Sequence, residues 1–155
     1  MKILAIDPGT IESGWVKYDT NKKEIFGHAK ECNSNILSVI RGTSADVLAI
    51  EMVKCYGMPM GDTTIDTVVW IGRFIQVASG KMKIVRIPRK TVCGHICNSA
   101  KAKDSHIRQA LIDRFGGTKE KAIGVKSSPG PLYKMCEDAR SALAVAITYA
   151  EMEVK

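Results

Sequence analysis

Two short stretches decide the fold: Ile3-Leu-Ala-Ile-Asp7 near the start of the chain and Val47-Leu-Ala-Ile-Glu51 further along. Each is a run of four apolar residues followed by a carboxylate. Strands that are apolar on both faces are typical of the buried central strands of a parallel pair. Residues 2–7 and 46–51 are therefore predicted to be neighbouring parallel strands.

In-register pairing of these strands would place Asp7 and Glu51 side by side, because adjacent strands lie about 4.8 Å apart. Ligand sites in open α/β sheets form at this carboxyl edge. Two carboxylates so close repel unless a cation lies between them or one is protonated. A hard divalent ion with oxygen ligands satisfies this condition, and Mg²⁺ fits best. The alternative is that Asp7 only begins an Asp-Pro-Gly turn and Glu51 is a surface acid.

A third carboxylate is predicted to come from the last helix, expected from Glu137 to about residue 152. Its many alanines are small enough to pack closely on a sheet. Asp138 and Ala142 share a helix face because they are four residues apart. If that face meets the sheet, Asp138 points to the edge that carries Asp7. The alternative is that the acid only caps the positive end of the helix dipole.

Acids arranged in this way could hold two ions about 4 Å apart, which would activate a water and stabilise a leaving oxygen in phosphodiester hydrolysis. No histidine is needed as a base. The three histidines are scattered and are expected to be surface or loop residues: His28, His95 and His106.

The rest of the pattern predicts an α/β protein with a five-stranded mixed sheet flanked by helices on both faces. The first three strands form a meander and the later ones arrive by helical crossovers. Further strands are expected at 14–18, 24–29 and 82–87. Helices are expected at 35–41, from Asp62 or Thr63 to 79, from Pro88, and from Asp104 or Ser105 to 115; loops are expected at 54–62 and 127–131.

The chain length and the net charge limit the functions that the protein can have. The chain has 155 residues, 23 Lys+Arg and 16 Asp+Glu, which gives a net charge of +7. This length suits one domain, residues 1–155, and excludes two-domain machines such as actin-like ATPases. The surplus charge indicates a polyanionic partner, with simple solubility as the alternative. Residues 81–103 contain seven basic side chains and no acid, which favours nucleic acid.

The apolar stretches are short. The longest, residues 142–150, is far shorter than a membrane span. The N-terminal sequence reaches Asp7 before the core of a signal peptide could be complete. The five cysteines are an odd number and are predicted to be reduced thiols. These features predict a cytoplasmic protein with no membrane partner.

Three motifs taken in order resemble RuvC-type Holliday junction resolvases of the RNase H/integrase superfamily. They are Ile6-Asp-Pro-Gly9, Ala49-Ile-Glu51 and Asp138-Ala-Arg-Ser-Ala-Leu-Ala144. Residues 101–116 and 126–133 are similar to the phage-borne branch of that family, so the resemblance covers nearly the whole chain. It implies an RNase H-like fold and, for a phage-borne protein, a place in the host bacterial cytoplasm.

The resemblance implies a homodimeric crossover junction endodeoxyribonuclease that nicks four-way DNA junctions symmetrically, without a nucleotide cofactor. Asp7, Glu51 and Asp138 match the family's acids, which would hold two Mg²⁺ ions, with Mn²⁺ as a substitute ion. Lys90 and Lys103 lie roughly where the family has basic residues near the scissile phosphate. Lys103 is expected to neutralise that phosphate.

Flanking DNA contacts are expected to be salt-sensitive and independent of sequence. In the family, the loop after the Glu51 strand probes the junction centre, where an apolar side chain could unstack bases; ordinary packing is the alternative. The expected DNA-binding residues are Arg89, Lys90, Lys101, Lys103, Tyr56 and Met58. One candidate dimer interface is the helix that carries Val69, Trp70 and Phe74.

One position departs from the family pattern. RuvC proteins typically end with two acids spaced i, i+3 on the last helix, and here the second position is Ser141. A hydroxyl is a neutral, weak Mg²⁺ ligand, so Glu137, or the more distant Asp104, would have to compensate. The alternatives are therefore a catalytically weak or inactive junction-binding protein, or an RNase H-like nuclease that acts on another branched or hybrid substrate.

Overall fold

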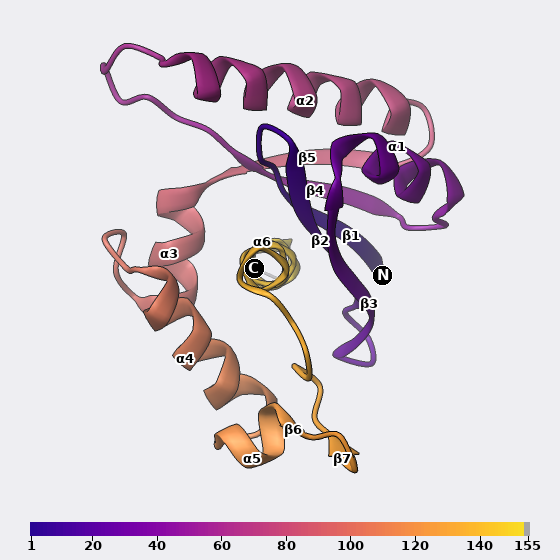
Figure 1. Ribbon diagram of the computed structural model, residues 1–155, viewed down its shortest axis with the longest axis vertical. Helices are drawn as coiled ribbons and strands as arrows, with labels where there is room; N and C mark the ends of the chain where they lie inside the picture. The colour runs from indigo at the N-terminus through magenta and orange to yellow at the C-terminus, as the bar shows by residue number, and fades with distance from the viewer. Residues whose placement is uncertain (154–155) are drawn as a thin grey trace.

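A five-stranded sheet forms the centre of the computed structural model, which describes residues 1–153. Its strand order is β3-β2-β1-β4-β5 (Figure 1). The antiparallel meander and the two strands added in parallel to it confirm the predicted mixed sheet. The strands are β1 (Lys2–Asp7), β2 (Glu12–Asp19), β3 (Glu24–Cys32), β4 (Val47–Met52) and β5 (Lys83–Pro88).

Strands β1 and β4 pair in the register that the two similar sequences predicted. Leu4 lies opposite Leu48, and Ile6 lies opposite Ile50. The acids that follow, Asp7 and Glu51, therefore end at the same edge of the sheet.

Helices cover both faces of the sheet (Figure 1). Because side chains alternate along a strand, Leu4 and Ile6 pack under α1 (Asn33–Gly42) and α2 (Asp62–Ala78). Ile3 and Ala5 face the opposite side, in the core that contains residues of α3 (Arg89–Cys97), α4 (Asp104–Phe115) and α6 (Glu137–Glu153). All four strand residues are fully buried.

Helix α6 lies directly on the sheet because its inner side chains are small. Ala139, Ala142 and Ala146 are fully buried in the core that contains Ile3 and Ala5. A buried stripe of alanines allows the helix axis to approach the strands closely, as expected from the sequence.

Helices α2 and α4 begin at Asp62 and Asp104, as expected from the sequence. Their N-caps are the preceding residues, Gly61 and Lys103. At the start of α4 the His106 ring contributes to the cap, because its Nδ1 accepts the Lys103 N–H at 2.9 Å.

The segment before α6 also holds more structure than the predicted loop. Figure 1 shows α5 (Lys119–Ala122), β6 (Gly124–Val125) and β7 (Ser128–Pro129) as an appendage away from the main sheet. These elements of two to four residues are too short to produce a periodic sequence pattern.

Within residues 1–153, no helix is both long and apolar enough to cross a bilayer. All five cysteines carry free thiols.

Candidate functional site

Three carboxylates lie near one another at the carboxyl edge of the sheet, where both Glu51 and Asp138 interact electrostatically with Asp7. Asp7 ends β1, Glu51 lies near the end of β4, and Asp138 lies in the first turn of α6. Gly14 on β2 pairs with Asp7, and a Cβ at position 14 would lie 2.3 Å from the carbonyl carbon of Asp138. The start of α6 therefore rests on the backbone beside Asp7, which brings the third acid to the other two.

A buried polar clamp holds the turn that follows Asp7. The Ser13 hydroxyl accepts the Gly9 N–H at 3.1 Å and donates to Asn33 Oδ1 at 2.6 Å. Asn33 Nδ2 donates in turn to the Gly9 carbonyl at 2.9 Å. Both side chains are almost fully buried. The sequence signalled only the Pro8-Gly9 turn, because the partner Asn33 is distant along the chain.

Asp7 is poorly stabilised as an anion. Burial, followed by the nearby Glu51 carboxylate, raises the pKa of Asp7 to about 8, with smaller contributions from Asp138 and Asp104 and an opposing one from Arg89. The pKa of Glu51 is also raised, mainly by burial, although Arg89 works against that rise. This is the electrostatic pattern expected where several acids share one site.

Arg89 lies among these acids, at the first position of α3. Its Nη1 donates to Glu51 Oε2 at 3.2 Å and to Ser141 Oγ at 3.3 Å, and its Nη2 pairs with Asp104. The sequence led us to expect Arg89 on the flanking surface. Its contacts lie instead on β4, α6 and α4, which only the tertiary structure brings together.

Lys30 on β3 completes the charged cluster and was missed from the sequence. Its Nζ lies 2.9 Å from Asp138 Oδ2 and 3.5 Å from Glu12 Oε2. The hydrogen bond with Asp138 is the main cause of a raised Lys30 pKa. A lysine on an outer strand carries no local signal of such a contact.

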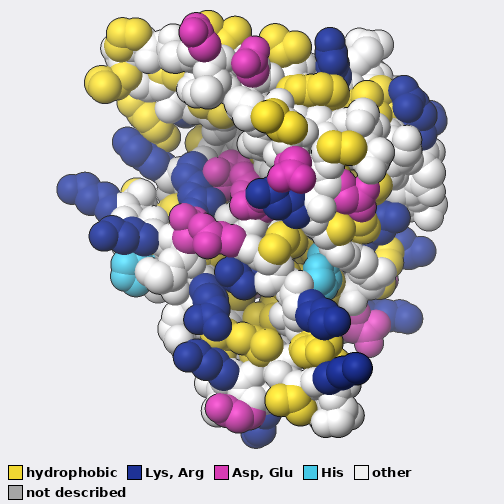
Figure 2. Space-filling view, viewed as in Figure 1, with side chains coloured by type: hydrophobic (Ala, Val, Ile, Leu, Met, Phe, Trp, Pro, Cys, Tyr) yellow, Lys and Arg dark blue, Asp and Glu magenta, His cyan; other side chains and the backbone are white. Residues whose placement is uncertain are grey.

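Two hollows meet at Asp7 and Pro8. One, of about 300 Å³, is lined by residues 7–12, Lys30 and Asp138. The other, of about 230 Å³, is lined by Asp7, Pro8, residues 51–54, Tyr56 and Arg89. Figure 2 shows acidic side chains gathered near the middle of one face, with basic side chains among and around them.

The donor chemistry of this edge fits a hard divalent cation. Glu51 and Asp138 each contact a basic side chain, whereas Asp7 makes no ion pair with a described residue. In the part of the chain that the structure covers, no three Asp, Glu, His or Cys side chains surround a single point closely enough to enclose an ion. An ion here would keep water ligands, as Mg²⁺ commonly does when one or two carboxylates hold it.

The expected DNA-binding residues lie on three segments: the loop after β4, helix α3 and the stretch just before α4. The ring of Tyr56, in the loop after β4, lies under the Lys90 ammonium at 3.6 Å, which links that loop to α3. Tyr56 is 56% exposed and Met58 is 73% exposed. Lys101 and Lys103 are exposed just before α4. Glu137 is exposed at the start of α6 and lines neither hollow.

Two side chains differ from their expected environments. Phe74 is fully buried in the core that contains residues of α1 and α2, so it is unavailable to an interface, whereas Val69 is exposed. His95 is not a loop residue and is only partly exposed. It lies on α3, half-buried, with Nε2 2.6 Å from Glu151 Oε2 on α6.

The fold matches solved structures from Thermus thermophilus. Its RuvC structure aligns with a TM-score of 0.66 and 15% identity over 99% of this chain and 97% of that one. T. thermophilus RuvC in complex with Holliday junction substrate aligns with a TM-score of 0.67 and 16% identity over 99% and 96% of the two chains. No protein-family model and no curated protein sequence matches the chain. The chain therefore has the RNase H-like α/β fold of RuvC, as its sequence motifs predicted.

Proposed function

We propose that this protein is a metal-dependent, structure-selective DNA endonuclease that resolves four-way or other branched junctions by paired nicks. The observation that supports the proposal is that Glu51 and Asp138 both lie close enough to Asp7, at the carboxyl edge of a RuvC-like fold, to raise its pKa. One of the matched RuvC structures is a complex with a Holliday junction. Residues 1–155 would act as one nuclease domain.

The three acids would hold Mg²⁺, with Asp7 central because it borders both hollows. Bound Mg²⁺ supplies an acidified water and positive charge for the phosphate. In the hydrolysis, the water oxygen bonds to phosphorus, the ester P–O bond breaks, and a proton ends on the leaving oxygen. Lys103 would neutralise charge on the phosphate group.

The exposed basic side chains near the acids would hold the DNA backbone. Lys90 on α3 contacts Tyr56 in the loop that also carries Met58, and Lys101 and Lys103 are exposed just before α4. Lys90 would contact phosphates of the DNA. Through its contact with the Tyr56 ring it would also hold that ring toward the junction centre, where an aromatic ring can unstack bases.

Paired nicks in a two-fold junction call for a two-fold dimer. Helix α2 exposes Ile65 and Val69, which makes its outer face the candidate interface. Sedimentation equilibrium should give twice the chain mass for the native protein and a smaller mass for Val69→Lys. An unchanged mass for that variant would place the interface elsewhere.

A cleavage assay on matched substrates tests the function. Synthetic four-way junction, fork, duplex and RNA–DNA hybrid would be incubated with the protein and Mg²⁺, with EDTA as the control. We expect symmetric nicks in the junction and little cleavage of the duplex. Equal cutting of all four substrates, or preference for the hybrid, would contradict junction resolution.

A junction-binding protein without catalysis is the second candidate. It is favoured by one observation: Arg89 already neutralises Glu51 and contacts the uncharged Ser141. Binding of the junction in a mobility-shift assay, without nicks in Mg²⁺ or Mn²⁺, would support this candidate over the first.

A further inference from the structure

The Arg89 guanidinium is held by groups from three different elements. Glu51 on β4 and Ser141 on α6 share its Nη1, and Asp104 on α4 takes its Nη2. Two of these three partners are carboxylates. The side chain is therefore anchored at both ends of its planar head, and only 33% of it is exposed.

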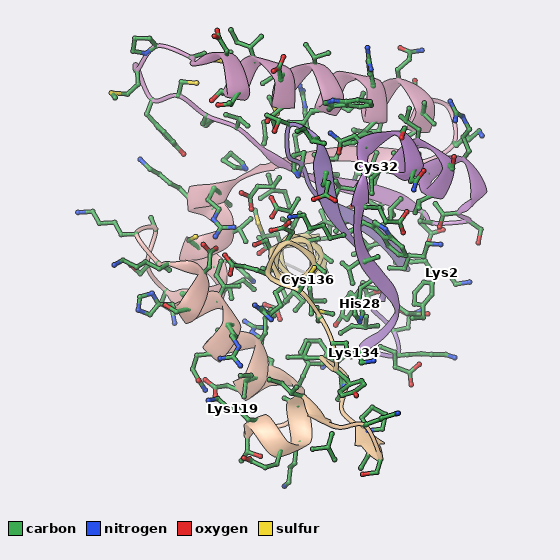
Figure 3. All side chains as sticks on the ribbon, in the orientation of Figure 1. Lys2, His28, Cys32, Lys119, Lys134 and Cys136 are labelled. Atoms are coloured by element: carbon green, nitrogen blue, oxygen red, sulfur yellow. The ribbon has the colours of Figure 1, made fainter. Side chains whose placement is uncertain are left out.

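A guanidinium held in this way is a permanent positive charge on the Glu51 side of the site. Arginine is not deprotonated in proteins, so the charge persists at any pH relevant to folding. Figure 3 shows side chains between α3, α4 and α6, and one of these contacts joins Arg89 to Ser141 in the second turn of α6. Arg89 thus neutralises the charges of Glu51 and Asp104, as a bound cation would.

The two hollows beside Asp7 consequently offer different environments to a metal ion. The Glu51-side hollow is lined by Arg89, so an ion there would face a like charge and share Glu51 with it. The neighbouring Ser141 hydroxyl adds no negative charge to offset that repulsion. On the Asp138 side, an ion would also meet a like charge, that of Lys30, but this side chain is more exposed than Arg89 (44% against 33%), so water screens its charge more and it can turn to Glu12 when an ion binds Asp138.

We propose that the site binds one divalent cation, at Asp7, and that Arg89 takes the place of a second one. This inference rests on the proposed nuclease function and replaces the two ions expected from the sequence. The guanidinium would supply the second positive charge against which a phosphate group can rest.

Ion counting on the full-length protein tests the inference. Free Mn²⁺ is measured by electron paramagnetic resonance as the ion is added to a known concentration of protein without DNA. The native protein should bind one tight ion per chain, and Asp7→Asn should bind none, which locates the counted ion. Ser141→Asp should still bind one ion, because the new carboxylate would pair with Arg89.

The decisive variant removes the guanidinium and supplies a carboxylate together. Arg89→Gln combined with Ser141→Asp should bind two ions per chain, with folding verified by circular dichroism. Two tight ions in the native protein, or one in this folded double variant, would overturn the inference. If the double variant does not fold, the native count decides alone, with one ion in support and two against.

A parallel junction-cleavage assay separates this inference from the proposed function. Two ions bound with cleavage intact would overturn the role of Arg89 and leave the nuclease standing. One ion bound without cleavage would support the role of Arg89 and overturn the proposed nuclease function. No tight ion and no cleavage would overturn both.

Discussion

Gly14 and Asp138 approach each other so closely that no larger residue fits at position 14. A Cβ built there would lie 2.3 Å from the Asp138 carbonyl carbon and 2.6 Å from its Cβ. Gly14 also pairs with Asp7 across the β1–β2 ladder. The missing side chain therefore sets the distance between the acid on α6 and the acid on β1.

Gly14→Ala should push the start of α6 away from the sheet. We expect a loss of cleavage of at least tenfold and weaker Mn²⁺ binding, because Asp138 would no longer reach the ion at Asp7. Gly94→Ala on α3 is the matched control, since no atom lies within 4 Å of its added Cβ and alanine favours a helix. Full activity of Gly14→Ala would show that the close approach is not required.

Asp7→Asn should abolish Mg²⁺-dependent cleavage and leave junction binding intact, because the variant keeps the shape of the site but loses the central anion. Cleavage gels and mobility shifts on the same four-way junction measure the two properties. Asp113→Asn, an exposed acid on α4, should behave like the native protein. Near-native cleavage by Asp7→Asn would exclude the mechanism.

The raised pKa of Asp7 predicts a pH-dependent stability of the metal-free protein. The pKa lies near 8 in the folded state, against 3.8 for an ordinary aspartate. The folded chain therefore keeps a proton on Asp7 that the unfolded chain releases. The contribution of this proton to the free energy of unfolding is complete below about pH 4 and is lost as the pH rises through about 8. The slope is at most about 1.4 kcal/mol per pH unit.

Urea unfolding in EDTA between pH 5 and pH 9 checks this, with Asp7→Asn as the reference. The free energy of unfolding of the native protein should fall relative to the variant as the pH rises. Added Mg²⁺ should restore stability most at high pH, since the ion competes with the proton. A constant difference between the two proteins would contradict the raised pKa.

Lys90 should contribute to both affinity and loop position. Lys90→Ala is expected to weaken junction binding and to lower the salt dependence of the binding constant by about one ion. It also frees the Tyr56 ring that lies 3.6 Å from the ammonium, so Tyr56 fluorescence in a tyrosine-reduced background should change. Lys22→Ala, in the β2–β3 turn, is the control that should alter neither property. An identical salt slope for Lys90→Ala and the native protein would rule out a phosphate contact.

The clamp behind Asp7 predicts a stability effect away from the acids. Asn33→Ala would leave the buried Ser13 hydroxyl and the Gly9 carbonyl without their partner. An unsatisfied buried polar group costs about 1–3 kcal/mol, which thermal unfolding can detect. Asn35→Ala, exposed on the same helix, should change stability far less. Equal effects of the two substitutions would argue against the clamp.

Much of the fold could be predicted because it depends on local pattern. The four-residue apolar runs ending at Asp7 and Glu51 determined two buried parallel strands, their register and the shared edge of the two acids. The alanines of α6 likewise indicated a helix that lies flat on a sheet. In each case the pattern of buried residues follows from neighbouring positions in the sequence, so it can be predicted without knowing a distant partner.

Only the tertiary structure decided which charges meet at that edge. Arg89 lies 38 residues from Glu51 and 52 from Ser141 along the chain, and it binds both. Lys30 reaches Asp138 from an outer strand, and Gly14 admits the helix that carries that acid. Contacts of this kind depend on how helices dock on the sheet. Their electrostatics follow from burial, which a linear sequence does not contain.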